Sequence, residues 1–332
     1  MKAAFFLQHG DTDQIQVDEF KTPDVGPHDV LIRVRAASLN GFDPMILQGA
    51  TDLQTPLPMI PLGDFAGEIA KIGSSVQKWR IGDRVCPFPY VMGDGMMGET
   101  RLGAAAEYVA MPAVNLLRLP ENVSFEEAAC LPIAYGAALR MMYDRAKVRR
   151  GETVLILGAT GGVGVCALQL AKAAGCEVIA CGGAEWKLQK LKEIGADHVI
   201  NTSKDDFQDV IASMYGKPAF FGGGGVDVVV NYIGGDTWVK SLKCLTKGGR
   251  LMTCGATAGF SPEEDIRYIW SFELNIMGSN GWLPPDQVKL LDMAADGRLQ
   301  PYIHAVRPLE QTASSIQQLI DRDVFGKIVI TP

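Results

Sequence analysis

Residues 153–164, which read TVLILGATGGVG, constrain the fold of this chain more than any other segment. A short apolar run ends in a cluster of glycines, and residues 165–175 then follow the pattern of a helix. Glycines let a backbone turn tightly and approach a phosphate, and the first-turn N–H groups of a helix attract phosphate oxygens. This order of strand, turn and helix predicts a dinucleotide site, the alternative being a tight turn without a ligand. The predicted binding residues are Ala159, Thr160, Gly161, Gly162, Val163 and Gly164.

Two regions of different pattern indicate two domains, as expected for 332 residues. The first ~120 residues read as short strands separated by Gly, Pro and Asp, beginning with MKAAFFLQHG. At Ser124 a helix is expected to begin, with Glu127 at the capping-box position. Strands and helices then alternate, which predicts a doubly wound parallel sheet of the Rossmann type. The helices are expected at 163–174, 185–194, 205–214 and 236–246, before a final helix and a closing strand, GKIVITP.

Composition and charge exclude several classes of function. A net charge of −7 gives no basic footprint for nucleic acid. No apolar run approaches the ~20 residues of a membrane helix, and the apolar start is shorter than a signal-peptide core. The seven cysteines form no C-x-x-C pair, which is typical of reduced thiols in a cytoplasmic protein.

The end of the second predicted strand, EVIAC, indicates which dinucleotide is bound. NAD-binding proteins of this type usually place a carboxylate there, about 20 residues after the glycines, to bind the ribose hydroxyls. Here Gly182 and Gly183 follow the strand, and Glu185 comes only where the helix begins. Lys187 stands in the first helical turn, within reach of a 2′-phosphate or simply in solvent. The missing acid and the nearby lysine favour NADPH.

The chain resembles the medium-chain dehydrogenases/reductases over nearly its whole length. The resemblance rests on ATGGVG after a strand and on fragments in the same order, among them ASLNGFDPMILQG, PLGDFAGEIAKIG, AAEYVA, LRLPENVSFEEAACLPIAYGAAL and LTKGGRLMTCG. It implies a GroES-like β-rich domain, residues 1–123 and 270–332, split around a Rossmann domain, residues 124–269. It further implies an active site in the cleft between them and a small-molecule substrate.

The same resemblance bears on a catalytic metal. Zinc-dependent members have a Cys in the segment written here as SLNGFD, a His in GDF and a further Cys before the helix of YGAA. The matching positions are Asn40, Asp64 and Ala129, with Cys130 one residue away. The four-cysteine structural zinc lobe is also missing, because residues 86–110 contain one cysteine. Since zinc needs three firm ligands, we expect no metal and a resemblance to the zinc-free branch of quinone oxidoreductases and double-bond reductases.

Within that branch the resemblance suggests roles for several residues. Asn40 is expected to donate to a substrate oxyanion, and Asp64 to orient Asn40 or a water; the alternatives are a loop and a turn residue. Tyr90 or Tyr135 is a candidate proton donor, with solvent as the alternative. The residues expected to line the nicotinamide, unless they are simple strand ends, are Gly255, Ala256, Ser279 and Asn280.

The function expected from these features is NADPH-dependent hydride transfer to a quinone or an α,β-unsaturated carbonyl compound. The alternatives are a zinc-free alcohol or polyol dehydrogenase and a non-catalytic NADPH-binding protein. The family resemblance also implies a homodimer, or a dimer of dimers. Residues 272–279 would form its interface, because a bare apolar edge strand is an aggregation hazard that two-fold pairing removes.

Overall fold

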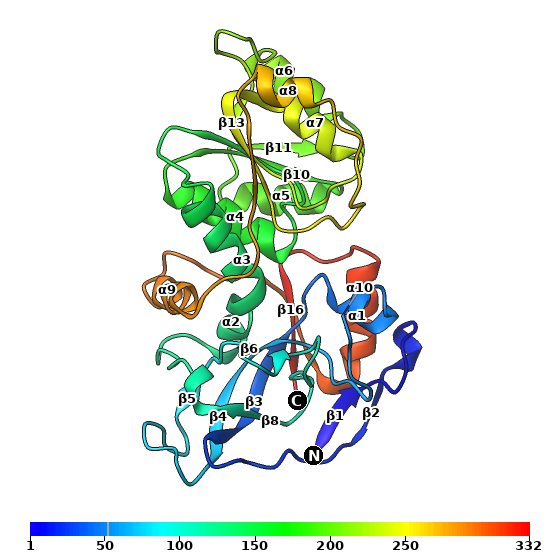
Figure 1. Cartoon of the computed structure of the whole chain (residues 1–332), viewed down its shortest axis with the longest axis vertical. Helices are drawn as coiled ribbons and strands as arrows, with labels where there is room; N and C mark the ends of the chain where they lie inside the picture. The colour runs from blue at the N-terminus through cyan, green and yellow to red at the C-terminus, as the bar shows by residue number, and fades with distance from the viewer. Residues whose placement is uncertain (52) are drawn as a thin grey trace. The chain divides into compact units, whose positions relative to one another are not determined.

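The computed structural model describes residues 1–51 and 53–332 and contains two compact units. Unit 1 comprises residues 1–134 and 283–332, and unit 2 comprises residues 135–282 (Figure 1). The first domain is therefore discontinuous, but both boundaries differ from the predicted 123/124 and 269/270. The first moves because helix α2 (Phe125–Ala129) packs on strands of unit 1, and the second because strand β14 (Asn275–Gly278) joins the sheet of unit 2.

Unit 1 is built on a sheet of order β15-β16-β3-β4-β5, in which β8 also pairs with β3. Buried and exposed residues alternate along the first part of β3, as expected for a sheet with one face on the core. Two small sheets, β1-β2 and β6-β7, complete the β structure of the described residues. Both chain ends belong to this unit (Figure 1). Its elements are β1 (Lys2–Phe5), η1 (Thr12–Gln14), β2 (Gln16–Glu19), β3 (Asp29–Ser38), α1 (Asp43–Gln48), β4 (Asp64–Ile72), β5 (Arg84–Val85), β6 (Tyr90–Val91), β7 (Gly95–Met96), β8 (Tyr108–Pro112), η2 (Ala113–Asn115), α2, α9 (Pro284–Ala295), β15 (Ile303–Pro308), η5 (Leu309–Gln311), α10 (Thr312–Ile320) and β16 (Lys327–Thr331).

Unit 2 is the predicted doubly wound sheet. Its six strands are all parallel and follow the order β11-β10-β9-β12-β13-β14, with helices between them (Figure 1). The strand order reverses beside β9, and ligands of such sheets bind at this switch point, outside the carboxyl ends of the strands. Its elements are α3 (Gly136–Leu139), η4 (Arg140–Arg145), β9 (Thr153–Ile156), α4 (Gly162–Ala173), β10 (Glu177–Gly182), α5 (Glu185–Glu193), β11 (His198–Asn201), α6 (Phe207–Tyr215), β12 (Val226–Val230), α7 (Thr237–Cys244), β13 (Leu245–Thr253), α8 (Ile266–Ser271) and β14; the π-helical turn η3 (Leu131–Tyr135) joins the units.

Short sequence patterns predicted several of these helices correctly. Ser124 caps α2 in a complete capping box with Glu127, as predicted. The four helices expected in the Rossmann region are present within a few residues as α4, α5, α6 and α7. None of the helices in the described part of the chain combines the length and the apolar character of a membrane span.

Candidate functional site

Three strand ends meet at one edge of the sheet of unit 1. Strand β3 lies between β4 and β16 and runs antiparallel to both, so the end of β3 adjoins the beginnings of its two neighbours. Ser38 at the end of β3 is paired both with Asp64 and with Val329. This register brings Asn40, just after β3, together with Asp64 and Lys327, the first residues of β4 and β16.

The three side chains form one buried polar cluster. Asn40 donates from Nδ2 to Oδ2 of Asp64 over 2.9 Å, and its Oδ1 accepts from Nζ of Lys327 over 2.6 Å. Nζ of Lys327 also lies 3.3 Å from Oδ2 of Asp64, while the N–H of Ile133 donates to Oδ1 of Asp64 over 2.9 Å. The exposed fractions are 5% for Asn40, 0% for Asp64 and 2% for Lys327. The predicted contact between Asn40 and Asp64 is therefore present, and Lys327 completes it.

A second buried carboxyl group lies beside this cluster. Asp43 accepts the N–H of Asn40 at Oδ2 over 2.7 Å, whereas its Oδ1 has no hydrogen-bond partner among the described residues. Burial raises the pKa of Asp43 to about 7, although the Asn40 hydrogen bond and the charge of Lys327 oppose the rise. Burial likewise raises the pKa of Asp64, against the lowering effects of Lys327, Asn40 and Ile133.

The thiols next to the cluster are neutral. Burial raises the pKa of Cys130 to about 12, and the pKa of Cys86 is raised by burial and by the charge of Asp64. Neither thiol therefore supplies an anionic ligand at neutral pH without a metal to displace its proton.

The glycine turn of unit 2 has the geometry of a phosphate cradle. Gly158 adopts a φ of 69°, and a Cβ on Gly164 would lie 2.5 Å from backbone atoms of Ala159 and Gly158, so helix α4 packs directly on the turn. A Cβ on Gly161 would meet nothing closer than 3.8 Å, which leaves space in front of the helix. The N-cap residue, Gly161, has no side chain to cap α4, and the Tyr232 hydroxyl interacts with the backbone N–H of Gly164. The first-turn N–H groups of Gly162 and Val163 are therefore the ones that an anion would meet first. These residues fit a dinucleotide pyrophosphate.

The tip of the second strand also agrees with its sequence pattern. Strand β10 ends at Gly182, and no carboxylate follows before Glu185. The carboxylate of Glu185 is already held by Asn201 over 2.7 Å and by Lys204 over 2.6 Å. Lys187 is only 8% exposed, with Nζ 5.3 Å from the centre of the Trp186 ring, so it is not the solvated helix lysine considered as an alternative. Ser203, missed in the sequence, donates to the carbonyl of Gly183 and borders the same tip.

The other predicted cofactor residues follow the carboxyl ends of parallel strands. Gly255 and Ala256 come after β13, and Ser279 and Asn280 after β14. Parallel strands end at one edge of a sheet, so these residues share the edge that carries the glycine turn. The hydroxyl of Ser279 is buried without a hydrogen-bond partner among the described residues. A buried orphan hydroxyl at this edge is consistent with a position that a ligand completes.

The two candidate proton donors lie in different settings. Tyr90, on β6, is 45% exposed, whereas the Tyr135 side chain is completely buried. The position of either tyrosine in the sequence does not place it in the Asn40–Asp64–Lys327 cluster. The role of proton donor therefore stays a prediction for both. Sequence reasoning also missed Tyr232, whose hydroxyl donates to the carbonyl of Gly158 in the glycine turn. The only signal was its position just after the run VDVVV.

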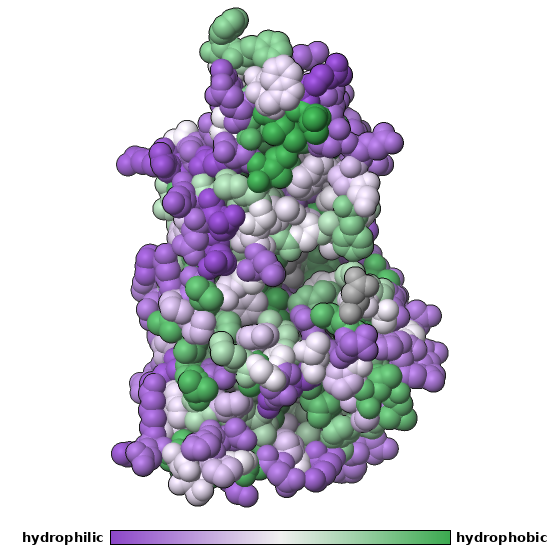
Figure 2. Space-filling view, viewed as in Figure 1, coloured by the Kyte–Doolittle hydropathy of each residue, from purple (hydrophilic) through white to green (hydrophobic). Residues whose placement is uncertain are grey.

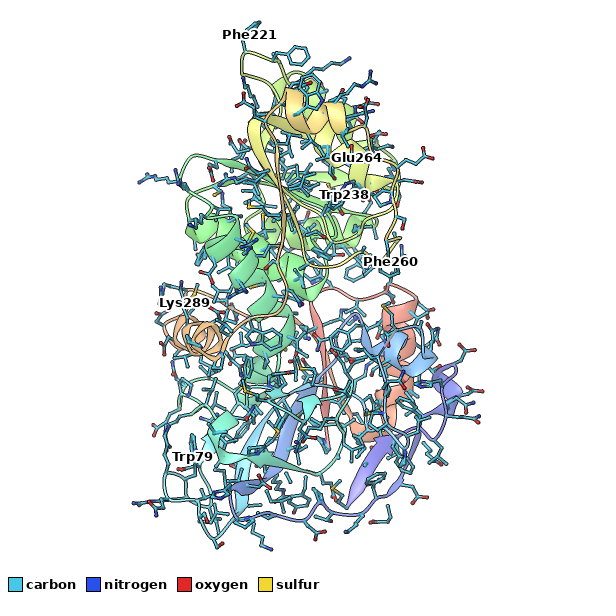
Figure 3. All side chains as sticks on the ribbon, in the orientation of Figure 1. Trp79, Phe221, Trp238, Phe260, Glu264 and Lys289 are labelled. Carbon is cyan, nitrogen blue, oxygen red and sulfur yellow. The ribbon has the colours of Figure 1, made fainter. Side chains whose placement is uncertain are left out.

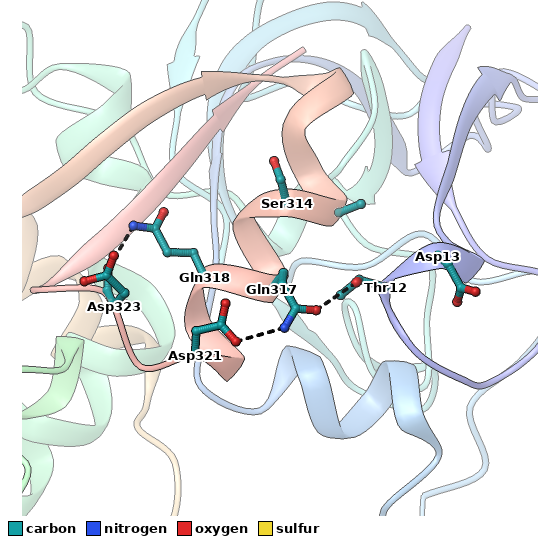
Figure 4. Close-up of a pocket in the computed structure, with 8 residues that line it drawn as sticks. Thr12, Asp13, Ser314, Gln317, Gln318, Asp321 and Asp323 are labelled. Carbon is teal, nitrogen blue, oxygen red and sulfur yellow. Dashed lines mark hydrogen bonds between the residues drawn. The ribbon is translucent and has the colours of Figure 1, made fainter.

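A hollow of about 560 Å³ lies elsewhere in unit 1, between η1 and α10 (Figure 4). Gln317 bridges it by accepting from Thr12 and donating to Asp321. Three aspartates, Asp13, Asp321 and Asp323, line it. Their negative charge does not suit a phosphate-bearing cofactor, and the hollow includes no residue of the Asn40 cluster.

Comparison with known proteins agrees with both halves of this description. Residues 26–121 match the alcohol dehydrogenase GroES-like domain, and residues 162–296 match the zinc-binding dehydrogenase family. A zinc-type alcohol dehydrogenase-like protein of Schizosaccharomyces pombe is 33% identical over 96% of this chain and 95% of its own length. Quinone oxidoreductase-like protein 2 of Bos taurus is 28% identical over 95% and 88%. The crystal structure of an NAD-dependent alcohol dehydrogenase superposes with a TM-score of 0.93 at 32% identity, with 100% of both chains covered.

The fold and these relatives define an oxidoreductase with a GroES-like domain and a Rossmann domain. The chain belongs to the medium-chain dehydrogenase/reductase family and to its quinone oxidoreductase branch, whose members bind a nicotinamide cofactor.

A zinc ion does not fit the Asn40–Asp64–Lys327 cluster as its side chains are arranged. The carboxylate of Asp64 is used by Asn40, Lys327 and Ile133, and the lysine ammonium lies 3.3 Å from it. A second cation at this carboxylate would face direct repulsion from that ammonium. Among the described residues no group of three His, Cys, Asp or Glu side chains is arranged to hold a metal ion.

Proposed function

We propose that this chain is a cytoplasmic, NADPH-dependent reductase of quinones or α,β-unsaturated carbonyl compounds that works without zinc. The observation that carries the proposal is the Asn40–Asp64–Lys327 cluster, which offers a hydrogen-bond donor where a metal site would otherwise be needed. Alcohol oxidation gains from a Lewis acid that stabilises an alkoxide. Reduction of a conjugated carbonyl spreads the developing charge, and hydrogen bonds are then sufficient to stabilise it.

The preference for NADPH is supported by the tip of β10. Gly182 and Gly183 present no carboxylate to repel a 2′-phosphate, and Lys187 supplies a positive charge in the first turn of α5. Ser203 places a hydroxyl beside Gly183, and phosphates are commonly bound by such hydroxyls together with lysines. Glu185 is held away by its own ion pair with Lys204.

Each step of the proposed reaction is assigned to the cofactor or to a residue of the chain as follows. When bound, NADPH supplies a hydride, which carries two electrons, to the β-carbon of an enone or to a quinone. The second N–H of the Asn40 amide donates to the acceptor oxygen and stabilises its negative charge. A proton then completes the product, on the α-carbon of the enone or on the quinone oxygen. Tyr90, Tyr135 and water remain the candidate donors of that proton.

A reductase assay tests this function. We expect NADPH consumption with quinones, enones or enoyl thioesters that survives treatment with a chelator, and weaker consumption of NADH. Turnover of alcohols with NADP⁺ would instead support a dehydrogenase, which the names of two relatives favour. Loss of that turnover on treatment with the chelator would further contradict the proposed independence from zinc. Tight NADPH binding with no turnover on the whole panel would support the non-catalytic alternative.

Replacing Asn40 tests its proposed role. Asn40→Ala should lower kcat on an accepted enone or quinone about tenfold, less than the 10²–10³ seen when one donor to a localised oxyanion is lost. The affinity for NADPH, measured by fluorescence titration, should stay nearly unchanged. A mutant with full kcat on every accepted substrate would reduce Asn40 to a structural loop residue.

We also propose a homodimer formed through unit 2, whose strand β14 ends the sheet. Apolar surface gathers over α8, the helix that precedes β14 in the chain (Figure 2). Ile266 and Trp270 of this helix are both exposed. The nearby Phe220 stacks on Phe272, and Phe221 is fully exposed (Figure 3).

Light scattering should therefore give at least twice the 35.8 kDa mass of the chain. Ile276→Lys on β14 should return the mass to that of one chain, because a charge would be buried in the interface. Val114→Lys, at an exposed apolar residue of unit 1, serves as the control and should leave the mass unchanged. A wild-type chain that is monomeric at micromolar concentration would contradict the proposal.

A further inference from the structure

The buried Lys327 has no obvious structural need. A lysine at the start of an otherwise apolar strand loses side-chain entropy and hydration on burial, and a hydrophobic residue would fill the space more favourably. Its ammonium group contacts two polar atoms, Oδ1 of Asn40 and Oδ2 of Asp64. The cost of burial and the choice of partners point to a role in the chemistry of the cluster.

The donors and acceptors of the cluster leave the Asn40 amide only one orientation. The two ends of an asparagine amide look alike, and the hydrogen-bond network must assign them. An ammonium group only donates, so the end of Asn40 that faces Lys327 must be the carbonyl oxygen. The other end of the amide, which faces Asp64, is therefore the NH₂ group, and it donates to Oδ2 of Asp64. One N–H of Asn40 is then left over for a further acceptor.

Lys327 also polarises that amide. Donation from a cation to the carbonyl oxygen draws electron density away from nitrogen, and hydrogen bonds linked in this way strengthen one another. The charge of Lys327 balances Asp64, while the adjoining Cys130 thiol stays neutral because burial raises its pKa to about 12. The cluster therefore presents a strengthened N–H donor with little net charge behind it.

We propose that Lys327 is a positioning residue that acts through Asn40: it fixes the amide with its N–H toward the acceptor oxygen and raises its strength as a donor. This inference rests on the reductase function proposed above. It assigns a specific task to a residue 287 positions away from Asn40 in the sequence.

A double-mutant cycle tests the proposal. Lys327→Met should lower kcat about tenfold, as Asn40→Ala does, with little change in NADPH affinity. The combined variant should be about tenfold slower as well, because Lys327 has no amide left to act through. Losses that multiply to about a hundredfold would overturn the proposal, as would a Lys327→Met enzyme with full kcat. Lys21→Met, which breaks an exposed lysine–aspartate pair with Asp24, is the matched control and should leave kcat unchanged.

Two further arms keep the test decisive. If Lys327→Met does not fold because it leaves Asp64 unpaired, Lys327→Met combined with Asp64→Asn removes both charges, and kcat should still fall about tenfold. If the wild-type chain reduces nothing on the panel, the proposed function fails, and a high-resolution crystal structure of Lys327→Met still decides the inference. The Asn40 amide should rotate or lose order in that structure, whereas an amide that keeps its orientation toward Asp64 would overturn the role of Lys327.

Discussion

Gly182→Asp should raise the dissociation constant for NADPH on the order of a hundredfold and leave that for NADH unchanged or lower. Gly182 is the last residue of β10, at the edge of the sheet that carries the glycine turn. A carboxylate at this tip would repel the 2′-phosphate of NADPH, and like charges brought together in a binding site cost several kcal/mol. With NADH the same carboxylate would accept hydrogen bonds from the ribose hydroxyls. Titration of both cofactors into both proteins measures the change in preference.

Gly182→Ala separates the charge from the added volume. A Cβ at this position would lie 3.0 Å from Cγ2 of Thr160 and 3.1 Å from Cδ2 of Leu188, so any side chain needs a small shift of these neighbours. The alanine variant adds the same crowding without the charge, so it should weaken the binding of NADPH and of NADH equally. A wild-type preference for NADH, or an aspartate variant that behaves like the alanine variant, would contradict the assignment of the 2′-phosphate to this tip.

The features that sequence patterns predicted are those formed by residues close together in the chain. The turn from Gly158 to Gly164, the capping box of Ser124 and Glu127, and the alternation of strands with helices depend on neighbours within about one element. The contact between Asn40 and Asp64 was expected from a family resemblance rather than from spacing. Strand pairing explains it, because the register of β3 and β4 places Ser38 opposite Asp64.

The role of Lys327 is the clearest example of what the sequence did not reveal. The run GKIVITP was interpreted as a closing strand that returns to the first domain, and β16 confirms this. Its register against β3 was not predictable from the run itself, and a shift by one residue would turn Lys327 to the other face of the sheet. Only the pairing of Val329 with Ser38 brings its ammonium group to Asn40. The domain boundaries moved for a similar reason, since α2 and β14 are assigned by the sheets on which they pack or pair.

Asp43→Asn should make the protein progressively more stable than wild type as the pH rises from about 4 to about 7. Burial raises the pKa of Asp43 to about 7 in the folded protein, against about 3.9 for an unfolded aspartate. The folded state therefore binds the proton more tightly, and its contribution to stability is present below about pH 4 and lost as the pH rises through about 7. An asparagine does not titrate, so the variant escapes this loss, which is on the order of 4 kcal/mol above pH 7. Urea unfolding of both proteins between pH 4 and 8 measures the difference.

The comparison of Asp43→Asn with wild type depends on how the free energy of unfolding changes with pH, not on the absolute stability of the variant. The introduced asparagine would keep the hydrogen bond from the Asn40 N–H, but its NH₂ group would lie where Oδ1 of Asp43 has no partner among the described residues. Burying this NH₂ group without a partner costs about 1–3 kcal/mol at every pH. It shifts the plot of unfolding free energy against pH without changing its slope.

The exposed Asp24 is a suitable control, because its hydrogen bond with Lys21 lowers its pKa. Asp24→Asn should therefore run nearly parallel to wild type over most of this range, because wild type loses this contribution only as the pH falls through the ordinary aspartate pKa of about 3.9 and below it. A difference between Asp43→Asn and wild type that stays constant from pH 4 to 8 would mean that Asp43 is ionised at its ordinary pKa in the fold. The charge of Lys327 would then be shared between two carboxylates.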